Sequence, residues 1–202
     1  MASNKFFRVF QIFKYCIYSL LALNVYLFFA DEWTAANHLF MDGVDIMDVF
    51  QAFSASIDTA AWVVLLLLFE METYVLSDEQ VEHHRWSLHG VRFLSYFFIL
   101  LSYHGYWAKS LDLYEVSPLQ ASTACELVDH ETFYMTTLDE FEKLTLENCQ
   151  ELPAEGGFVQ LNDTDIISDA EVLSDARALA WVDVFNASLW LLIVVMLELD
   201  VW

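Results

Sequence analysis

Four long apolar stretches constrain the fold of this chain more than any other feature of its sequence. They cover residues 15–30, 55–76, 93–108 and 178–199. A helix needs about 17 to 25 mostly apolar residues to cross the hydrocarbon core of a bilayer, which is roughly 30 Å thick. The first and third stretches are the shorter two, but Lys14 and Arg92 directly precede them and can extend to the interface. We therefore expect an all-α integral membrane protein with four transmembrane helices.

The composition agrees with a membrane protein and excludes one class of partner. Hydrophobic residues make up 57% of the 202 residues, whereas ordinary soluble domains contain about 45 to 50%. The chain also carries 30 acidic residues and only 8 basic ones, for a formal net charge of -22. This charge repels the phosphates of nucleic acids, so we expect no nucleic acid partner, whereas cations are attracted.

The distribution of basic residues predicts the orientation of the chain in the bilayer. Cytosolic segments beside membrane helices carry an excess of Lys and Arg. Here five of the eight basic residues precede the first stretch or lie between the second and third, at Lys5, Arg8, Lys14, Arg85 and Arg92, whereas residues 31–54 have none and residues 109–177 have three among sixteen acidic residues. We therefore expect both termini and the middle link in the cytosol, with residues 31–54 and 109–177 outside. A bacterial inner membrane and a eukaryotic plasma or secretory membrane both fit this orientation.

The long segment between the third and fourth stretches divides the chain into residues 1–108, 109–177 and 178–202. Two of the three cysteines, Cys125 and Cys149, lie in this acidic, extracytoplasmic segment. Oxidising compartments allow disulfides, so we expect a bridge between them, with two reduced cysteines as the alternative. The bridge would stabilise the segment by about 3 to 4 kcal/mol, because it restricts the unfolded chain.

Helix-start patterns predict that this outer segment is helical. Ser117 followed by Pro118 is typical of a helix N-terminus, and Thr136 followed by acidic residues indicates a second helix that runs toward Cys149. Ser168 and Glu171 have the spacing of a capping box that leads into the fourth membrane helix. The expected fold is a small, disulfide-linked helical insertion.

Two dipeptides that contain glycine indicate turns. Gly156 and Gly157 predict a turn within the outer segment. Asp42 and Gly43 predict a turn before a short amphipathic helix over residues 44–53.

The second and fourth stretches match one another in residue spacing. Their polar and aromatic residues occur at equal intervals, Asp58, Trp62 and Glu70 in one and Asn186, Trp190 and Glu198 in the other. The first and third stretches match more weakly, with Lys14 opposite Arg92. We therefore expect two tandem hairpins related as a parallel repeat. The match stops at Trp202, as expected of a chain that continues beyond it.

Ionisable side chains inside or beside the spans are the strongest candidates for function. Each charge within a span costs about 2.5 to 3.5 kcal/mol on insertion, so it needs a partner or water. The candidates are Lys14, Asp58, Glu70, Glu72, Arg92, Glu198 and Asp200. Glu70 and Glu72 point to nearly opposite sides of a helix. We expect one to pair within its own hairpin and the other with the second hairpin.

These charges have two interpretations. The first is an ionic clamp that holds the helices together. The second is a path for cations or protons that runs from Asp58, near the outer face, to Glu72, near the cytosolic face.

The middle link holds metal-capable side chains at His83, His84 and His89, with Glu79 and Glu82 nearby. They resemble one histidine box of the membrane di-iron desaturases and hydroxylases, but those enzymes need several boxes. A solvated or pH-sensitive cytosolic face fits the pattern better, so we predict no metal and no other cofactor.

Three functions remain open from the sequence. We expect a non-enzymatic membrane protein that packs against itself or other membrane subunits as an interaction or accessory subunit. The alternative is a cation channel or transporter that uses the intramembrane carboxylates. The third is a membrane metalloenzyme that uses the histidines of the link. No nucleophile motif or phosphate-binding loop is present.

Overall fold

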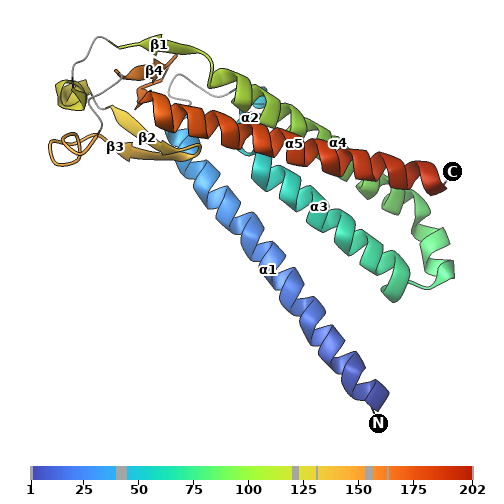
Figure 1. Ribbon diagram of the computed structural model, residues 1–202. Helices are drawn as coiled ribbons and strands as arrows, with labels where there is room; N and C mark the ends of the chain where they lie inside the picture. Colours follow the sequence, from blue (N-terminus) through green and yellow to red (C-terminus); the bar gives the residue numbers. More distant parts are fainter. Residues whose placement is uncertain are drawn as a thin grey trace. The chain divides into compact units, whose positions relative to one another are not determined.

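The computed structural model describes residues 2–39, 45–119, 123–130, 132–152, 157–162 and 164–201. Its long elements are helices, and their order along the chain is visible in Figure 1. The α-helices are α1 (Ala2–Leu39), α2 (Ile46–Ala52), α3 (Ser54–Glu70), α4 (Asp78–Asp112) and α5 (Ala170–Val201). One π-helical turn, η1 (Met71–Val75), continues α3, and one 3-10 helix, η2 (Ala124–His130), lies between α4 and α5.

Residues 109–177 also contain a five-stranded sheet. Its strands are β1 (Val116–Pro118), β2 (Phe133–Thr137), β3 (Glu140–Lys143), β4 (Val159–Leu161) and β5 (Ile166–Ser168), in the spatial order β1-β4-β5-β2-β3. The pair of β2 with β5 is parallel, and the other three pairs are antiparallel. The strands lie near the start of α5 (Figure 1).

The prediction of a helical insertion is therefore wrong. Ser117 and Pro118 belong to β1 instead of a helix N-terminus, and Thr136 belongs to β2, which turns back into β3. Pro118 lacks a backbone N–H, and an edge strand tolerates this loss because one of its sides needs no partner. The expected cap of the last helix is also displaced, because Ser168 ends β5 and Asp169 caps α5.

The predictions for the two turns fall partly outside the described residues. The helix expected over residues 44–53 is present as α2, whose Asp45 and Asp48 form a capping box, whereas Asp42 and Gly43 are not described. Gly157 has a φ of 77°, a left-handed conformation typical of glycine in turns. Its neighbour Gly156 is not described.

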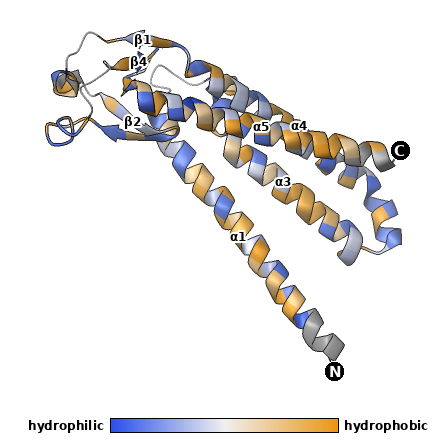
Figure 2. Cartoon of the chain, viewed as in Figure 1, coloured by the Kyte–Doolittle hydropathy of each residue, from blue (hydrophilic) through white to orange (hydrophobic). Residues whose placement is uncertain are grey.

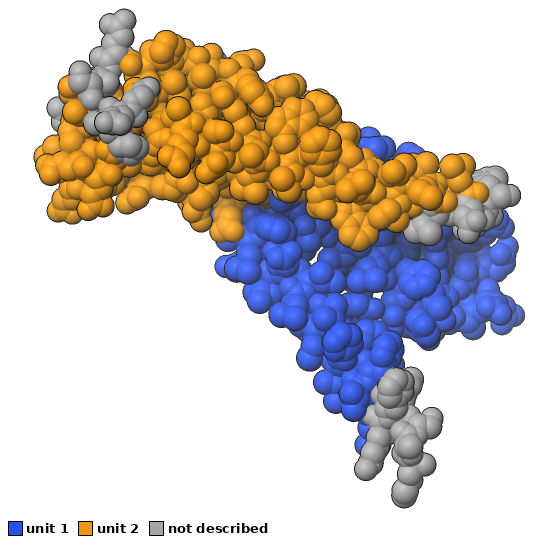
Figure 3. Space-filling model, in the orientation of Figure 1, with its two compact units in different colours: residues 1–30, 55–100 blue, residues 31–54, 101–202 orange. Residues whose placement is uncertain are grey.

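The chain divides into two compact units, shown in Figure 3. Unit 1 comprises Met1–Ala30 and Ala55–Leu100, and unit 2 comprises Asp31–Ser54 and Leu101–Trp202. Unit 1 therefore holds most of α1, α3 and α4. Unit 2 holds α2, the end of α4, the sheet and α5.

Three helical segments of the described chain are long and apolar enough to cross a membrane. They are Arg8–Leu39, Ser54–Val75 and Ala170–Met196, and apolar residues predominate along them in Figure 2. The remaining stretch, residues 93–108, is helical within α4 but is more polar, because it carries Ser, Tyr, His and Gly. The fold thus supports three spans, and a further span over residues 93–108 stays a prediction.

Successive residues of a strand point to opposite sides of a sheet. Along β5 and the first half of β2, in the middle of this sheet, both sides are buried. Met135 and Ile166 pack with Leu173, Ala176 and Ala180 of α5 in one core. Tyr134 and Ile167 face a second core, which contains Ala124, Cys149 and Phe158. The sheet is therefore held between α5 on one face and the disulfide-linked η2 region on the other.

Candidate functional site

The first cluster of charges in unit 1 joins α1 to the end of α3. Lys14 Nζ forms an ion pair with Glu70 Oε1, and Tyr18 Oη donates a hydrogen bond of 3.2 Å to Glu70 Oε2. Lys14 and Tyr18 are four residues apart, so they share one side of α1. Lys14 Nζ also lies 5.8 Å from the centre of the Tyr74 ring. The Glu70 carboxylate thus accepts hydrogen bonds from two side chains of α1.

The second cluster joins the same region to α4. Arg92 Nη2 lies 2.6 Å from Glu72 Oε2, and both side chains are partly buried. A charge-assisted bond of this length is among the stronger hydrogen bonds in proteins. Glu70 therefore pairs with a cation of α1, and Glu72 pairs with a cation of α4.

The π-helical turn η1 begins directly after Glu70 and contains Glu72. Its wider spacing is visible in the hydrogen bond of 2.9 Å from Leu76 N to Met71 O, which spans five residues. Single π turns occur often at functional positions. Here the turn separates the two carboxylates, and each is directed to a different cation.

Asp58 lies apart from these clusters. The indole N–H of Trp62 donates a hydrogen bond of 3.1 Å to Asp58 Oδ1. At about 1.5 Å per residue, Asp58 is roughly 20 Å along the helix from Glu72. The structure therefore brings Lys14, Glu70, Glu72 and Arg92 into two pairs, whereas Asp58 is remote from them. The side chains of Glu198 and Asp200 are not among those described.

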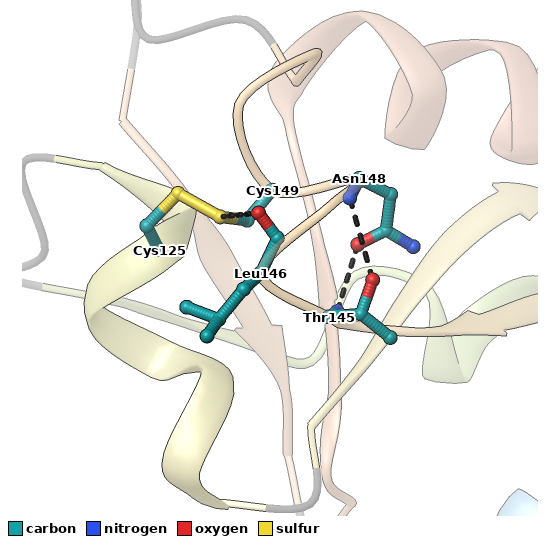
Figure 4. Close-up of a disulfide and its surroundings, with 5 residues drawn as sticks. All are labelled: Cys125, Thr145, Leu146, Asn148 and Cys149. Atoms are coloured by element: carbon teal, nitrogen blue, oxygen red, sulfur yellow. Dashed lines mark hydrogen bonds between the residues drawn. A yellow bond between two sulfur atoms is a disulfide. The ribbon is translucent and has the colours of Figure 1, made fainter.

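The predicted disulfide is confirmed in unit 2. Cys125 of η2 is bonded to Cys149, with Cα atoms 5.0 Å apart, as Figure 4 shows. Thr145 and Asn148 fix the turn before Cys149, because the side chain of each accepts a hydrogen bond from the backbone N–H of the other, at 2.7 and 3.3 Å. Cys149 is only 3% exposed, so the bridge belongs to the second core.

A buried polar contact that the sequence did not reveal connects the sheet to α5. Asp169 Oδ1 accepts hydrogen bonds from the backbone N–H groups of Glu171 and Val172, at 2.7 and 3.0 Å, and thereby caps the helix. Asp169 Oδ2 accepts a hydrogen bond from Tyr134 Oη. Burial, together with this bond to a carboxylate, raises the pKa of Tyr134 above its usual value. In the sequence, Asp169 directly before the helix was the signal that could have indicated this cap.

Two basic residues of unit 2 hold the end of α4 against its neighbours. Lys109 Nζ forms an ion pair with Asp139, in the turn between β2 and β3. The Arg177 guanidinium of α5 donates hydrogen bonds of 3.0 and 2.8 Å to Leu113 O and lies 4.5 Å from the Tyr114 ring centre. These contacts fix the positions of the sheet and α5 within unit 2.

The histidines of the link do not form a metal site with their neighbours. The rings of His83 and His84 are 4.9 Å apart, and His84 Nδ1 lies 3.0 Å from Gln80 O. His89 lines a surface pocket with Arg85 and Trp86. Among the described residues, no three His, Cys, Asp or Glu side chains lie close enough together to hold a metal ion.

The fold and these contacts define a helical protein with three helices able to cross a membrane and a small, disulfide-linked β-sheet domain. Comparisons with protein-family models, with curated proteins and with solved structures found no match to the chain. The chemistry of the site therefore carries the functional conclusion.

Proposed function

We propose that this chain is a non-enzymatic, polytopic membrane protein that acts as an interaction or accessory subunit of a membrane assembly. Residues 93–108 form the fourth span, the N-terminus is cytosolic, and residues 109–177 lie outside the membrane. The two hairpins are related as a parallel repeat. The partners are the bilayer and other membrane subunits or further copies of the chain.

One observation carries this proposal: Glu70 and Glu72, the described carboxylates near the cytosolic end of α3, are both held by cations of neighbouring helices. A carboxylate that lines an ion path must exchange its partner for the passing ion, whereas a carboxylate in an ion pair adds cohesion between helices. The two ion pairs therefore favour an ionic clamp between helices over a path for cations or protons.

The exposed surface of the spans supports a role in packing against other helices. None of the apolar window of Arg8–Leu39 is buried within the chain. Its exposed side chains include large aromatic ones, at Phe10, Phe13, Tyr15, Tyr26, Phe28, Phe29 and Trp33. In a bilayer, helices associate through van der Waals packing and interhelical hydrogen bonds rather than through a hydrophobic driving force.

The alternative, a cation channel or transporter, is favoured by Asp58. It accepts a hydrogen bond from Trp62, but no described Lys or Arg forms an ion pair with it. Ionisable side chains within spans often mark ion pathways. The net charge of -22 would also concentrate cations at the outer segment.

Purification of the full chain in a mild detergent, followed by measurement of the mass of the particle, tests the proposal. A stoichiometric complex with other membrane proteins is expected. A symmetric homo-oligomer that conducts cations in liposomes would favour the channel, and bound iron or zinc would favour the metalloenzyme. Either result would contradict the accessory role.

The two roles of Glu70 are separated by one substitution. Glu70→Gln is expected to lower the melting temperature of the protein, because Lys14 loses its charged partner, and to leave cation flux in liposomes unchanged. Glu79→Gln, at an exposed position of the link, is the matched control. A loss of flux without a loss of stability would contradict the clamp.

A further inference from the structure

A cavity of about 410 Å³ lies within unit 2, between the sheet and the ends of α2 and α4. Part of its wall is apolar and comes from the first core, where Leu113, Met135, Leu138 and Leu161 are almost fully buried. Pockets for small molecules usually measure about 300 to 1,000 Å³ and have mostly apolar walls with a few polar groups. The cavity has the size and the lining of such a pocket.

Three of the polar residues that line the cavity are acidic. Its lining includes the carboxylates of Asp48, Asp112 and Glu115. Asp48 accepts a hydrogen bond from the backbone of Asp45, and Asp112 accepts one from the Gln51 amide. Glu115 makes no hydrogen bond or ion pair through its side chain with the described residues. A carboxylate accepts about four hydrogen bonds, so all three retain free capacity.

Lys109 is the one basic residue among the described residues that line the cavity, and its charge is already compensated. Its ammonium group forms an ion pair with Asp139, and the Lys109 side chain is only 14% exposed. The cavity therefore remains negative, and an anionic ligand would meet three carboxylates. A ligand with a positive charge complements the lining.

The arrangement of the carboxylates selects the kind of cation. Within the described chain, no group of three acidic, histidine or cysteine side chains is compact enough to surround a metal ion. An organic ammonium group needs no such cage, because each of its N–H groups can reach a separate acceptor. The apolar part of such a ligand would also cover the apolar wall of the cavity, which a bare metal ion would leave in contact with water.

We propose that this cavity binds a small amphipathic amine, with its apolar body against Leu113, Met135 and Leu161 and its ammonium group toward Asp112 and Glu115. The inference is independent of the accessory role, because every residue that carries it lies in unit 2.

Three indoles of similar size that differ in charge test the proposal on the full chain in a neutral detergent. They are tryptamine, 3-ethylindole and indole-3-propionate, and equilibrium dialysis against protein-free micelles corrects for partition into detergent. Tryptamine is expected to bind at least about threefold more tightly than 3-ethylindole, and the propionate more weakly than both. Equal binding of the three, or no saturable binding of tryptamine, would overturn the proposal.

Two isosteric substitutions then locate the ammonium group. Glu115→Gln and Asp112→Asn are each expected to weaken tryptamine binding about two- to fivefold and to leave 3-ethylindole binding unchanged. Glu140→Gln, at an exposed position of β3 outside the cavity lining, is the control. Tryptamine binding that is unchanged by both lining substitutions, in variants that melt like the parent protein, would place the amine elsewhere and overturn the assignment.

Discussion

At the scale of single residues, the contact between Tyr134 and Asp169 joins the sheet to the N-terminus of α5. Asp169 is 5% exposed, and its carboxylate serves both the helix backbone and the Tyr134 hydroxyl. The carboxylate is also at the end of the helix where negative charge is favourable. The start of α5 therefore depends on a residue of β2, far away in sequence.

This contact predicts that the disulfide-linked sheet domain loses stability in alkali. The raised pKa of Tyr134 means that the folded state holds the phenolic proton more tightly than the unfolded state does. The stabilisation is fully present below the unfolded pKa of about 10 and is lost as the pH rises toward the higher, folded pKa. Thermal unfolding followed by near-ultraviolet circular dichroism at pH 8 and pH 11 measures the effect.

Tyr134→Phe is the matched variant for this measurement. It is expected to be less stable at pH 8 by about 0.5 to 1.5 kcal/mol, because one hydrogen bond is lost. Its melting temperature should fall less between pH 8 and pH 11 than that of the parent protein. An equal fall in both proteins would show that Tyr134 does not control the alkaline transition.

Gly105 of α4 allows a close approach of two backbones within unit 2. A Cβ atom built on Gly105 would overlap the backbone carbonyl of Phe50 and lie 3.1 Å from Ser54 Cβ. Small residues at such positions let helices pack tightly in membranes. Gly105→Ala is therefore expected to destabilise the protein by about 1 to 3 kcal/mol.

Gly90 on the same helix gives the control. No atom lies within 4 Å of a Cβ built there, so Gly90→Ala should leave the stability unchanged or raise it by up to about 1 kcal/mol. Denaturation of both variants in the same detergent measures the difference. Equal effects at the two positions would contradict a tight contact at Gly105.

At the scale of elements, the helices were predictable and the sheet was not. Long apolar runs have few alternatives to helices, because a bilayer requires every backbone group to be paired within the segment. Strands of three to five residues in an acidic segment carry a far weaker signal. The aromatic and β-branched residues of Phe133–Thr137 favour a strand, but Thr136 and the acids after it also match the start of a helix.

Some residues of the candidate site were predictable, because leaving them without a partner would cost free energy. An unpaired charge in a span is expensive, so the sequence indicated that Glu70 and Glu72 need cations. The oxidising compartment likewise indicated the bridge between Cys125 and Cys149. The cavity of unit 2 depends on how the sheet packs against α2 and α4, and no local pattern encodes that packing.

The disulfide is expected to supply much of the stability of the sheet domain, because the sheet is small. Replacing Cys125 and Cys149 together with Ser should lower the free energy of unfolding of this domain by about 3 to 4 kcal/mol. Urea denaturation under oxidising conditions measures it. Cys16→Ser, at an exposed position of α1, should have no such effect, and an equal loss in both proteins would contradict the prediction.

At the scale of the whole molecule, the proposed function requires the disulfide-linked domain and the histidine link to lie on opposite sides of one bilayer. Three spans are supported by length and composition, and a fourth, over residues 93–108, is needed to carry the chain from the cytosolic link to the outside. The basic residues near α1 and at the start of α4 then remain inside, as the positive-inside rule expects.

Labelling of single introduced cysteines in intact cells tests this arrangement most directly. In a Cys16→Ser background, Glu140→Cys in β3 and Glu82→Cys in the link place one thiol on each expected side, at exposed positions. A membrane-impermeant maleimide should label Glu140→Cys in intact cells and Glu82→Cys only after lysis. Labelling of Glu82→Cys in intact cells, with Glu140→Cys protected until lysis, would contradict the topology and the function built on it.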